Sequence, residues 1–375
     1  MRQLRHTFTL ENHKYYFQGM KMQSCLYLLL LSSLAISTNL IAFEQKSKKN
    51  SDAPKQFSVG VNGNAMLRFE NDTFTVRNHR QRLRFIGRIG LTAKYGDFKF
   101  VSRLSTGLKN KQNVPAITIS KFNTQPQPDS DIFVELLFMQ YQTKPLTITI
   151  GKLPWAFANQ TDTFWDRQLH PQGVHLKYQF SPDEQARVAW LKPLDGATDT
   201  VGTLLIAQYA STIPFAKGKL ILAPWWVDYQ GGIAQFAKRD TQYDHQSIRL
   251  SGAYVTGQWR YGVDAGYALD TPELIVGNKQ NQSLAIQVNY GRLKQQGDYQ
   301  THLRLFRTER FGVISEFAQN ATAGFATAYI KGFDTRVRYK ISPSVWVGAR
   351  YSQLDTITGT AERSHRFRIE TAATF

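Results

Sequence analysis

Residues 80–107 alternate between two unlike sets of side chains, and this alternation restricts the fold more than any other feature of the sequence. In the first half of the stretch the even positions are mostly basic and the odd positions mostly apolar; after Gly96-Asp97 the pattern resumes with Phe98 and Phe100 on one face. A period of two places neighbouring side chains on opposite faces of a β-strand. A strand that spans a membrane in a barrel needs about 9–11 residues, apolar toward lipid and polar toward the interior. The stretch therefore predicts one hairpin of a transmembrane β-barrel with a basic interior.

The same alternation recurs from residue 57 to residue 375 and predicts about sixteen strands. Short turns follow the even-numbered strands and longer loops mostly follow the odd-numbered ones. This is typical of barrels with short periplasmic turns and longer external loops. Two-sheet sandwiches also alternate, but they lack this one-sided asymmetry of the loops. We therefore predict an all-β fold, a transmembrane antiparallel β-barrel over residues 57–375.

The fourth predicted strand is assigned an apolar face made of the even positions from Ile132 to Phe138. The eighth and ninth predicted strands, near 201–211 and 217–229, have blurred alternation, so their limits are uncertain.

An apolar run near the N-terminus predicts a secretory signal peptide. It extends from Cys25 to Ile36 and follows Lys21, which is too short for a membrane-spanning helix and typical of a signal sequence. We expect cleavage near Ala42. Residues 1–42 would then be an N-terminal extension plus signal peptide, and residues 43–56 a periplasmic tether. Because Cys25 is the single cysteine of the chain, no disulfide would support the mature protein.

The chain is strongly basic, with a net charge of +18 at pH 7. Such a charge suggests nucleic acid, anionic lipid or anionic solutes as partners. The basic residues are spread through the alternating segments, and no nucleic-acid-binding motif accompanies them. We therefore expect no nucleic-acid partner, and we expect small anionic or polar solutes instead.

One segment resembles a known family. Between Gly151 and Tyr178, the pattern of Gly151-Lys152, Asp166 and Pro171-x-Gly173 is similar to that of a bacterial family of outer-membrane β-barrel porins. The hairpin at residues 80–107 resembles the early hairpin of the same family, and phosphate-selective porins are a looser analogy. The sequence departs from the family pattern at Gln172, where an acidic residue is usual.

This resemblance implies a Gram-negative outer-membrane location and contact with outer-membrane lipid and lipopolysaccharide. It also implies a homotrimer and a terminal Phe375 that is presented to the barrel-assembly machinery. No cofactor is expected.

Twelve arginines on the polar faces of the predicted strands are candidate pore-lining residues. They are Arg82, Arg84, Arg88, Arg103, Arg249, Arg260, Arg304, Arg336, Arg338, Arg350, Arg366 and Arg368. Rings of arginine favour anions, and the planar guanidinium offers paired donors to phosphate or carboxylate. The alternative is that any wide lumen is polar and that arginine packs its stem on its neighbours.

The segment at 153–170 follows the fifth predicted strand, where porins often fold a loop inward. Its candidate constriction residues are Trp155, Phe157, Phe164, Trp165, Asp166 and Arg167. The alternative is that the aromatic residues anchor strand ends at the membrane interface.

The sequence contains no recognisable catalytic constellation. His170 and His175 lack the cysteine or carboxylate cluster that would complete a metal site, and no nucleophile motif is present. We therefore predict a channel rather than an enzyme. The predicted function is passive diffusion of small hydrophilic solutes with a preference for anions, including phosphate-like ions. The alternative is a plugged or narrow barrel that acts as a surface adhesin or structural outer-membrane protein.

Overall fold

The computed structural model describes most of the chain after residue 56. The described residues are 57–107, 115–122, 131–193, 202–230, 244–269, 280–319, 322, 325–357 and 362–375. The predicted N-terminal extension, signal peptide and tether lie outside them and remain predictions. No helix that is long and apolar enough to cross a bilayer occurs among the described residues.

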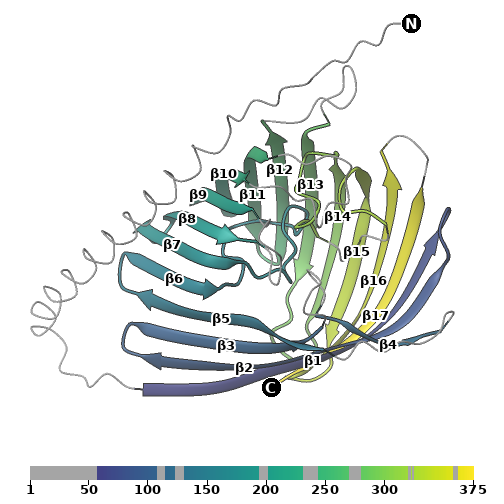
Figure 1. Ribbon diagram of the computed structural model, residues 1–375, viewed down its shortest axis with the longest axis horizontal. Helices are drawn as coiled ribbons and strands as arrows, with labels where there is room; N and C mark the ends of the chain where they lie inside the picture. Colours follow the sequence, from purple (N-terminus) through teal and green to yellow (C-terminus); the bar gives the residue numbers. More distant parts are fainter. Residues whose placement is uncertain are drawn as a thin grey trace, which may run out of the picture. The chain divides into compact units, whose positions relative to one another are not determined.

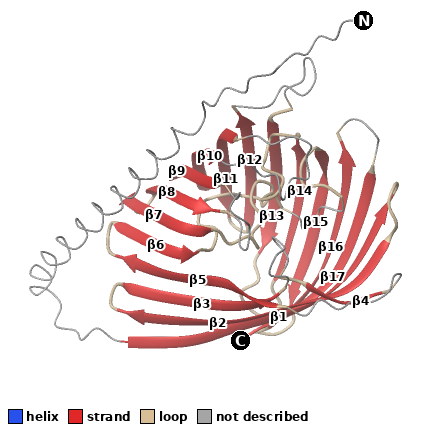
Figure 2. Cartoon of the chain, in the orientation of Figure 1, coloured by secondary structure: helices blue, strands red, loops and turns tan. Residues whose placement is uncertain are grey.

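The described residues form seventeen β-strands in one antiparallel sheet (Figures 1 and 2). Their bounds are β1 (Phe57–Phe74), β2 (Arg80–Tyr95), β3 (Phe98–Thr106), β4 (Ile117–Lys121), β5 (Ile132–Gln142), β6 (Leu146–Lys152), β7 (Gln172–Ser181), β8 (Glu184–Lys192), β9 (Thr203–Phe215), β10 (Gly218–Gln230), β11 (His245–Thr256), β12 (Trp259–Ala268), β13 (Gln282–Gly291), β14 (Tyr299–Thr308), β15 (Ile330–Lys340), β16 (Val345–Thr356) and β17 (Arg363–Thr374).

The sheet closes on itself because β17 pairs with β1 along eleven residue pairs, from Asn64↔Thr374 to Phe74↔Ser364. The short strand β4 is an addition to the barrel wall. It pairs with the Arg82–Phe85 part of β2, beyond the part that pairs with β3. Without β4, sixteen strands form the closed circuit. The predicted antiparallel barrel of about sixteen strands is confirmed.

Alternation of side chains explains the two surfaces of the barrel. Ile89 on β2 faces outward and is 52% exposed, whereas Arg84 on the opposite face of the same strand is buried. Aromatic rings follow one another around the end with the short turns, for example Phe98–Tyr141 at 5.0 Å and Trp259–Tyr290 at 4.6 Å between centroids. An outer apolar band with an aromatic girdle is what a bilayer requires of a spanning barrel.

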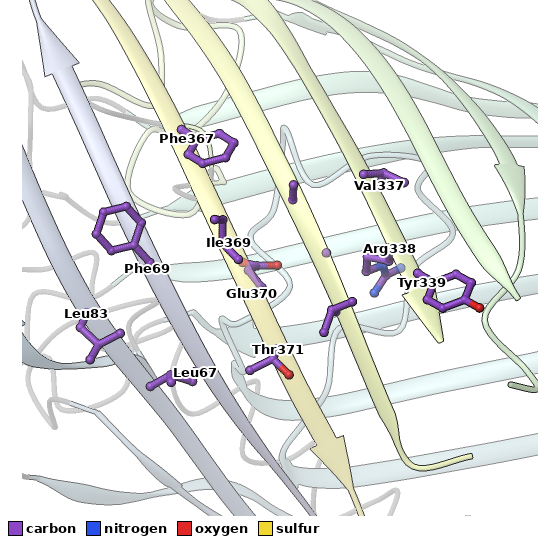
Figure 3. A pocket seen from close by; sticks show the side chains of 13 residues that line it. Leu67, Phe69, Leu83, Val337, Arg338, Tyr339, Phe367, Ile369, Glu370 and Thr371 are labelled. Atoms are coloured by element: carbon purple, nitrogen blue, oxygen red, sulfur yellow. The ribbon is translucent and has the colours of Figure 1, made fainter. Parts of the chain in front are cut away.

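A groove with a volume of about 490 Å³ lies in the apolar band of the outer surface (Figure 3). Leu67, Phe367 and Ile369 line it on one side and Val337 and Tyr339 on the other. The exposed residues that line it belong to the outward faces of β1, β15, β16 and β17. The groove is therefore part of the outer surface and not of the barrel interior.

The predicted apolar face of β5 is wrong in its second half. The pairing of β3 with β5 shifts register by one residue, so that Glu135 becomes the extra residue of a β-bulge. Beyond the bulge Leu136 points inward and is 5% exposed, while Leu137 points outward and is 46% exposed. A single inserted residue reverses the faces of every residue that follows it in the strand.

Candidate functional site

Two segments of chain enter the barrel interior. The first inward segment is residues 153–171, between β6 and β7. The second inward segment is the described part of the chain between β14 and β15, residues 309–319, 322 and 325–329. They are joined by backbone hydrogen bonds, from the N–H of Asp166 to the carbonyl oxygen of Phe317 (2.7 Å) and from the N–H of Gln319 to that of Asp162 (3.1 Å). The two segments therefore form one interior body.

A glycine lies close to each junction between the first inward segment and the barrel wall. Gly151, the second-last residue of β6, has φ +129°, and a Cβ there would lie 2.2 Å from the carbonyl oxygen of Leu137. Gly173 on β7 has φ +152°, with a Cβ position 2.1 Å from the carbonyl oxygen of Trp190. Only glycine fits both the backbone angles and the space.

An apolar core fills the side of the interior formed by β5 to β10. Trp155 stacks on Trp165 at 4.1 Å between ring centroids, and Phe164 meets Trp225 of β10 edge-on at 5.1 Å. The buried members of this core include Leu136, Phe138, Phe157, Leu169, Leu191, Leu204, Ile206, Val227, Tyr229, Ile314 and Phe317. The four aromatic residues predicted for the constriction loop therefore lie inside the barrel. Phe157, Phe164 and Trp165 belong to this core, and Trp155 packs against it.

This core also explains the blurred alternation of β9 and β10. The inward face of β9 carries Leu204 and Ile206, both fully buried, because it packs against the inward segments and not against water. A strand that is apolar on both faces cannot show a clear period of two.

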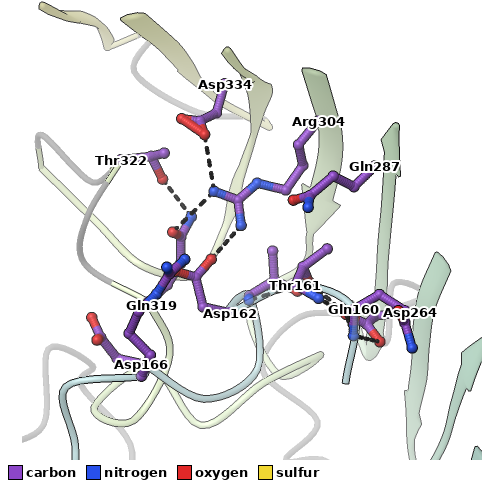
Figure 4. A network of polar contacts seen from close by, with 12 residues as sticks. Gln160, Thr161, Asp162, Asp166, Asp264, Gln287, Arg304, Gln319, Thr322 and Asp334 are labelled. Atoms are coloured by element: carbon purple, nitrogen blue, oxygen red, sulfur yellow. Dashed lines mark hydrogen bonds and ion pairs between the residues drawn. The ribbon is translucent and has the colours of Figure 1, made fainter. Parts of the chain in front are cut away.

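Polar contacts fix the opposite edge of the interior body (Figure 4). The carboxylate of Asp162 accepts hydrogen bonds from Arg304 of β14 and, at 2.7 Å, from Arg167. Burial alone would raise the pKa of Asp162, but the charges of Arg167, Arg304 and Arg350 outweigh it and hold this pKa below its ordinary value. Asp162 is therefore a fixed negative charge that ties the first inward segment to the wall.

Eight of the twelve predicted arginines are ion-paired with carboxylates inside the barrel. The pairs are Arg82, Arg84 and Arg368 with Glu70; Arg366 with Asp72; Arg88 and Arg103 with Glu135; Arg304 with Asp162 and Asp334; and Arg350 with Asp334. Glu70, Asp72, Glu135 and Asp162 are not among the site residues predicted from the sequence. Glu70 and Asp72 continue the even-numbered polar face of the first strand, a signal that could have identified them. Much of the arginine excess on β1, β2 and β17 is thus neutralised locally.

The other four arginines form no ion pair with a carboxylate among the described residues. Arg249 and Arg260 contact the inward segments, Arg260 through the Gln160 side chain at 2.6 Å. Arg338 donates to Gln300 and lies 5.2 Å over the Trp346 ring. Arg336 has no hydrogen-bond partner for its guanidinium in the described part of the chain.

Arg167 differs from the other arginines of the interior because its side chain is 55% exposed. The adjacent Asp162 carboxylate raises the pKa of Arg167, which keeps it charged. Its charge acts on both Arg336 and Arg338 of β15, so the three guanidinium groups are near enough to interact electrostatically. Asp166, the other charged residue predicted for the constriction loop, is buried.

The end of the first inward segment is attached through a histidine. His170 Nε2 lies 3.4 Å from Glu135 Oε1 and 3.3 Å from Arg103 Nη2. Arg88 contacts the same carboxylate and the Gln168 side chain. Burial lowers the pKa of His170, while Glu135 opposes this shift.

Comparison with known proteins gives fold similarity alone. No protein-family model matches the sequence, and no curated protein matches it. Among solved structures, the outer-membrane porin OprB of Pseudomonas putida is similar with a TM-score of 0.56 and 6% identity, over 84% of this chain and 94% of that one. OpdQ of Pseudomonas aeruginosa is similar with a TM-score of 0.50 and 11% identity, over 85% of this chain and 99% of that one. The predicted resemblance to outer-membrane porins is confirmed for the fold.

Proposed function

We propose that the chain is an outer-membrane porin, a water-filled channel for passive diffusion of small hydrophilic solutes that prefers anions, including phosphate-like ions. The observation that supports it best is the group of three cations formed by Arg167, Arg336 and Arg338 inside the barrel. Arg167 is 55% exposed, and neither Arg336 nor Arg338 forms an ion pair with a carboxylate among the described residues.

The position of the apolar core limits the route. Because the inward segments pack on the inner faces of β5 to β10, solutes would pass along the opposite wall, between the first inward segment and β15. There the charge of Arg167 faces charges of the same sign. Both sides of the constriction would therefore be positively charged, and both would attract anions.

Charge and geometry both favour oxyanions in this route. Arg336 and Arg338 have no carboxylate partner among the described residues, and cations of this kind between low-dielectric walls raise the local concentration of anions. Guanidinium groups present planar pairs of donors, which suit phosphate and carboxylate oxygens. Three such groups around one space suit a small oxyanion better than a neutral solute.

The proposed porin function also implies where the protein is located and what it contacts. The outer apolar band would contact outer-membrane lipid and lipopolysaccharide, and export would need the predicted signal peptide. Phe375 would be presented to the barrel-assembly machinery, and the chain would assemble as a homotrimer.

Ion selectivity in a planar bilayer tests the proposal. Purified protein should give open channels whose reversal potential in a KCl gradient reports a preference for chloride, and added phosphate should reduce the chloride current. Replacing Arg336 and Arg338 together by glutamine should lower the preference. The matched control is Arg307→Gln, because Arg307 faces outward on β14 and is 52% exposed.

Two outcomes would reject the proposal. Equal permeability to both ions in the wild type would reject the anion preference. A protein that inserts but never conducts would favour the alternative of a plugged barrel with a surface or structural role, which the filled β5–β10 side also suits.

A further inference from the structure

Arg249 on β11 contacts both inward segments and the barrel wall at once. Its guanidinium carbon lies 4.0 Å from the ring centre of Phe164 in the first inward segment. Its Nη1 donates to the carbonyl oxygen of Gly312 in the second inward segment at 3.1 Å. Its Nη2 donates to Ser283 Oγ on β13 at 3.0 Å. One buried side chain, 5% exposed, thus connects three separate parts of the interior.

The neighbouring strand leaves space for this guanidinium. Arg249 pairs in register with Gly266 of β12. A Cβ at Gly266 would lie 2.3 Å from Arg249 Nη1 and 2.5 Å from its Cζ. The guanidinium therefore lies flat on the Gly266 backbone, and any larger residue there would displace it.

The chemistry of the contacts requires arginine. Arg249 has no carboxylate partner among the described residues, so its charge is stabilised by the faces of Phe164 and Trp225, the latter 5.5 Å from Cζ, and by two neutral oxygen acceptors. A planar guanidinium can stack on a ring and donate in two directions at the same time, which an ammonium group cannot do in one geometry. The sequence predicted that Arg249 lines the pore. In the structure its side chain is buried against the two inward segments.

We propose that Arg249 is a positioning residue, a clamp that holds the two inward segments together and thereby sets the width of the channel. This inference rests on the proposed channel function for its effect on conductance. It does not depend on that function for its effect on the inward segments themselves.

A thiol-accessibility experiment tests the clamp without reference to transport. Cys25 is replaced by Ser, which leaves no cysteine in the chain, and Val313→Cys then introduces one thiol at a position that is fully buried in the second inward segment. In this background the thiol should resist a water-soluble maleimide in the folded barrel. Arg249→Met should make it reactive, because the segments separate.

Two further variants separate the clamp from a general loss of folding. Gly266→Ala retains the arginine at position 249 but displaces its guanidinium, so it should also expose the thiol. Gly252→Ala in the same hairpin is the control, since its nearest neighbour would be Val263 Cγ1 at 3.3 Å, and it should leave the thiol protected. Arg260→Met, which removes a contact with the first segment alone, should also leave it protected.

Single-channel recording supplies the second readout. Arg249→Met and Gly266→Ala should replace one steady conductance level by fluctuating, larger levels. A thiol that stays unreactive in both variants would overturn the clamp, whether or not the protein conducts. A wild type that does not conduct would instead refute the channel, while the thiol results would still decide the role of Arg249.

Discussion

The carboxylate of Asp264 on β12 accepts hydrogen bonds from both the backbone N–H and the hydroxyl group of Thr161, at 2.5 and 2.6 Å. The same carboxylate also accepts the backbone N–H of Gln160 at 3.0 Å and the hydroxyl of Ser251 at 2.5 Å. One acidic residue of the wall therefore holds the first inward segment at its midpoint. Figure 4 shows this attachment beside the contact between Asp162 and Arg304.

Replacing Asp264 by alanine should leave these buried donors without an acceptor. Because each unsatisfied buried group costs about 1–3 kcal/mol, we expect the free energy of unfolding to fall by roughly 3 kcal/mol or more. Urea unfolding in detergent, followed by tryptophan fluorescence, measures this loss. Asp298→Ala is the control, since Asp298 accepts hydrogen bonds from Lys294 and Gln295 in an exposed turn. Equal losses in the two variants would contradict the assigned role of Asp264.

Closure of the barrel depends on Gly63. The backbone of Gly63 exchanges hydrogen bonds of 2.9 and 3.1 Å with Phe375, whose ring would lie 2.3 Å from a Cβ at Gly63. Gly63→Ala should displace this ring and destabilise the barrel by about 1–3 kcal/mol. Gly60→Ala on the same strand is the matched control, because a Cβ there meets nothing within 4 Å. The loss of folded, heat-modifiable protein on unboiled gels measures the difference, and identical behaviour of the two variants would refute this prediction.

The stability of the protein should depend on pH through His170. Burial lowers the pKa of His170 in the folded state, so the unfolded chain, with a histidine pKa of about 6.5, binds this proton first as the pH falls. The contribution of His170 to stability is therefore complete above about pH 6.5 and is lost progressively below it. Comparing the free energies of unfolding of wild type and His170→Gln at pH 8 and pH 5 isolates this component. The acid-induced loss should be smaller in the variant; an equal loss would exclude His170 as its source.

Arg167→Gln should reduce the proposed anion preference with little effect on stability, because the side chain is more than half exposed. A unit charge about 4 Å from a permeating ion contributes about 1 kcal/mol in water-like surroundings, so a change of about fivefold in the permeability ratio is expected. The effect should also weaken as KCl rises from about 0.1 to about 1 M, since the Debye length falls from about 10 to about 3 Å. Reversal potentials at both concentrations test this. A ratio independent of both Arg167 and salt would assign the selectivity to other residues.

Most of the fold could be predicted from the sequence. The alternation in β2, with arginine on one face and apolar residues on the other, follows from a wall between lipid and water, and it placed Arg82, Arg84 and Arg88 inside the barrel. The order of short turns and long loops fixed the strand count because each turn interrupts the period. Alternation and turn positions are local properties of the chain, so they can be recognised without any knowledge of the tertiary contacts.

Only the tertiary structure decided which interior residues meet. The bulge at Glu135 depends on the partner strand, so the sequence misplaced Leu136. Asp162 and Arg304 are 142 positions apart, and the path of an irregular segment between strands has no period that would bring them together. Alternation states which face of a strand a side chain occupies, but whether that face meets water, as near Arg167, or a packed core, as at Arg249, depends on what fills the interior.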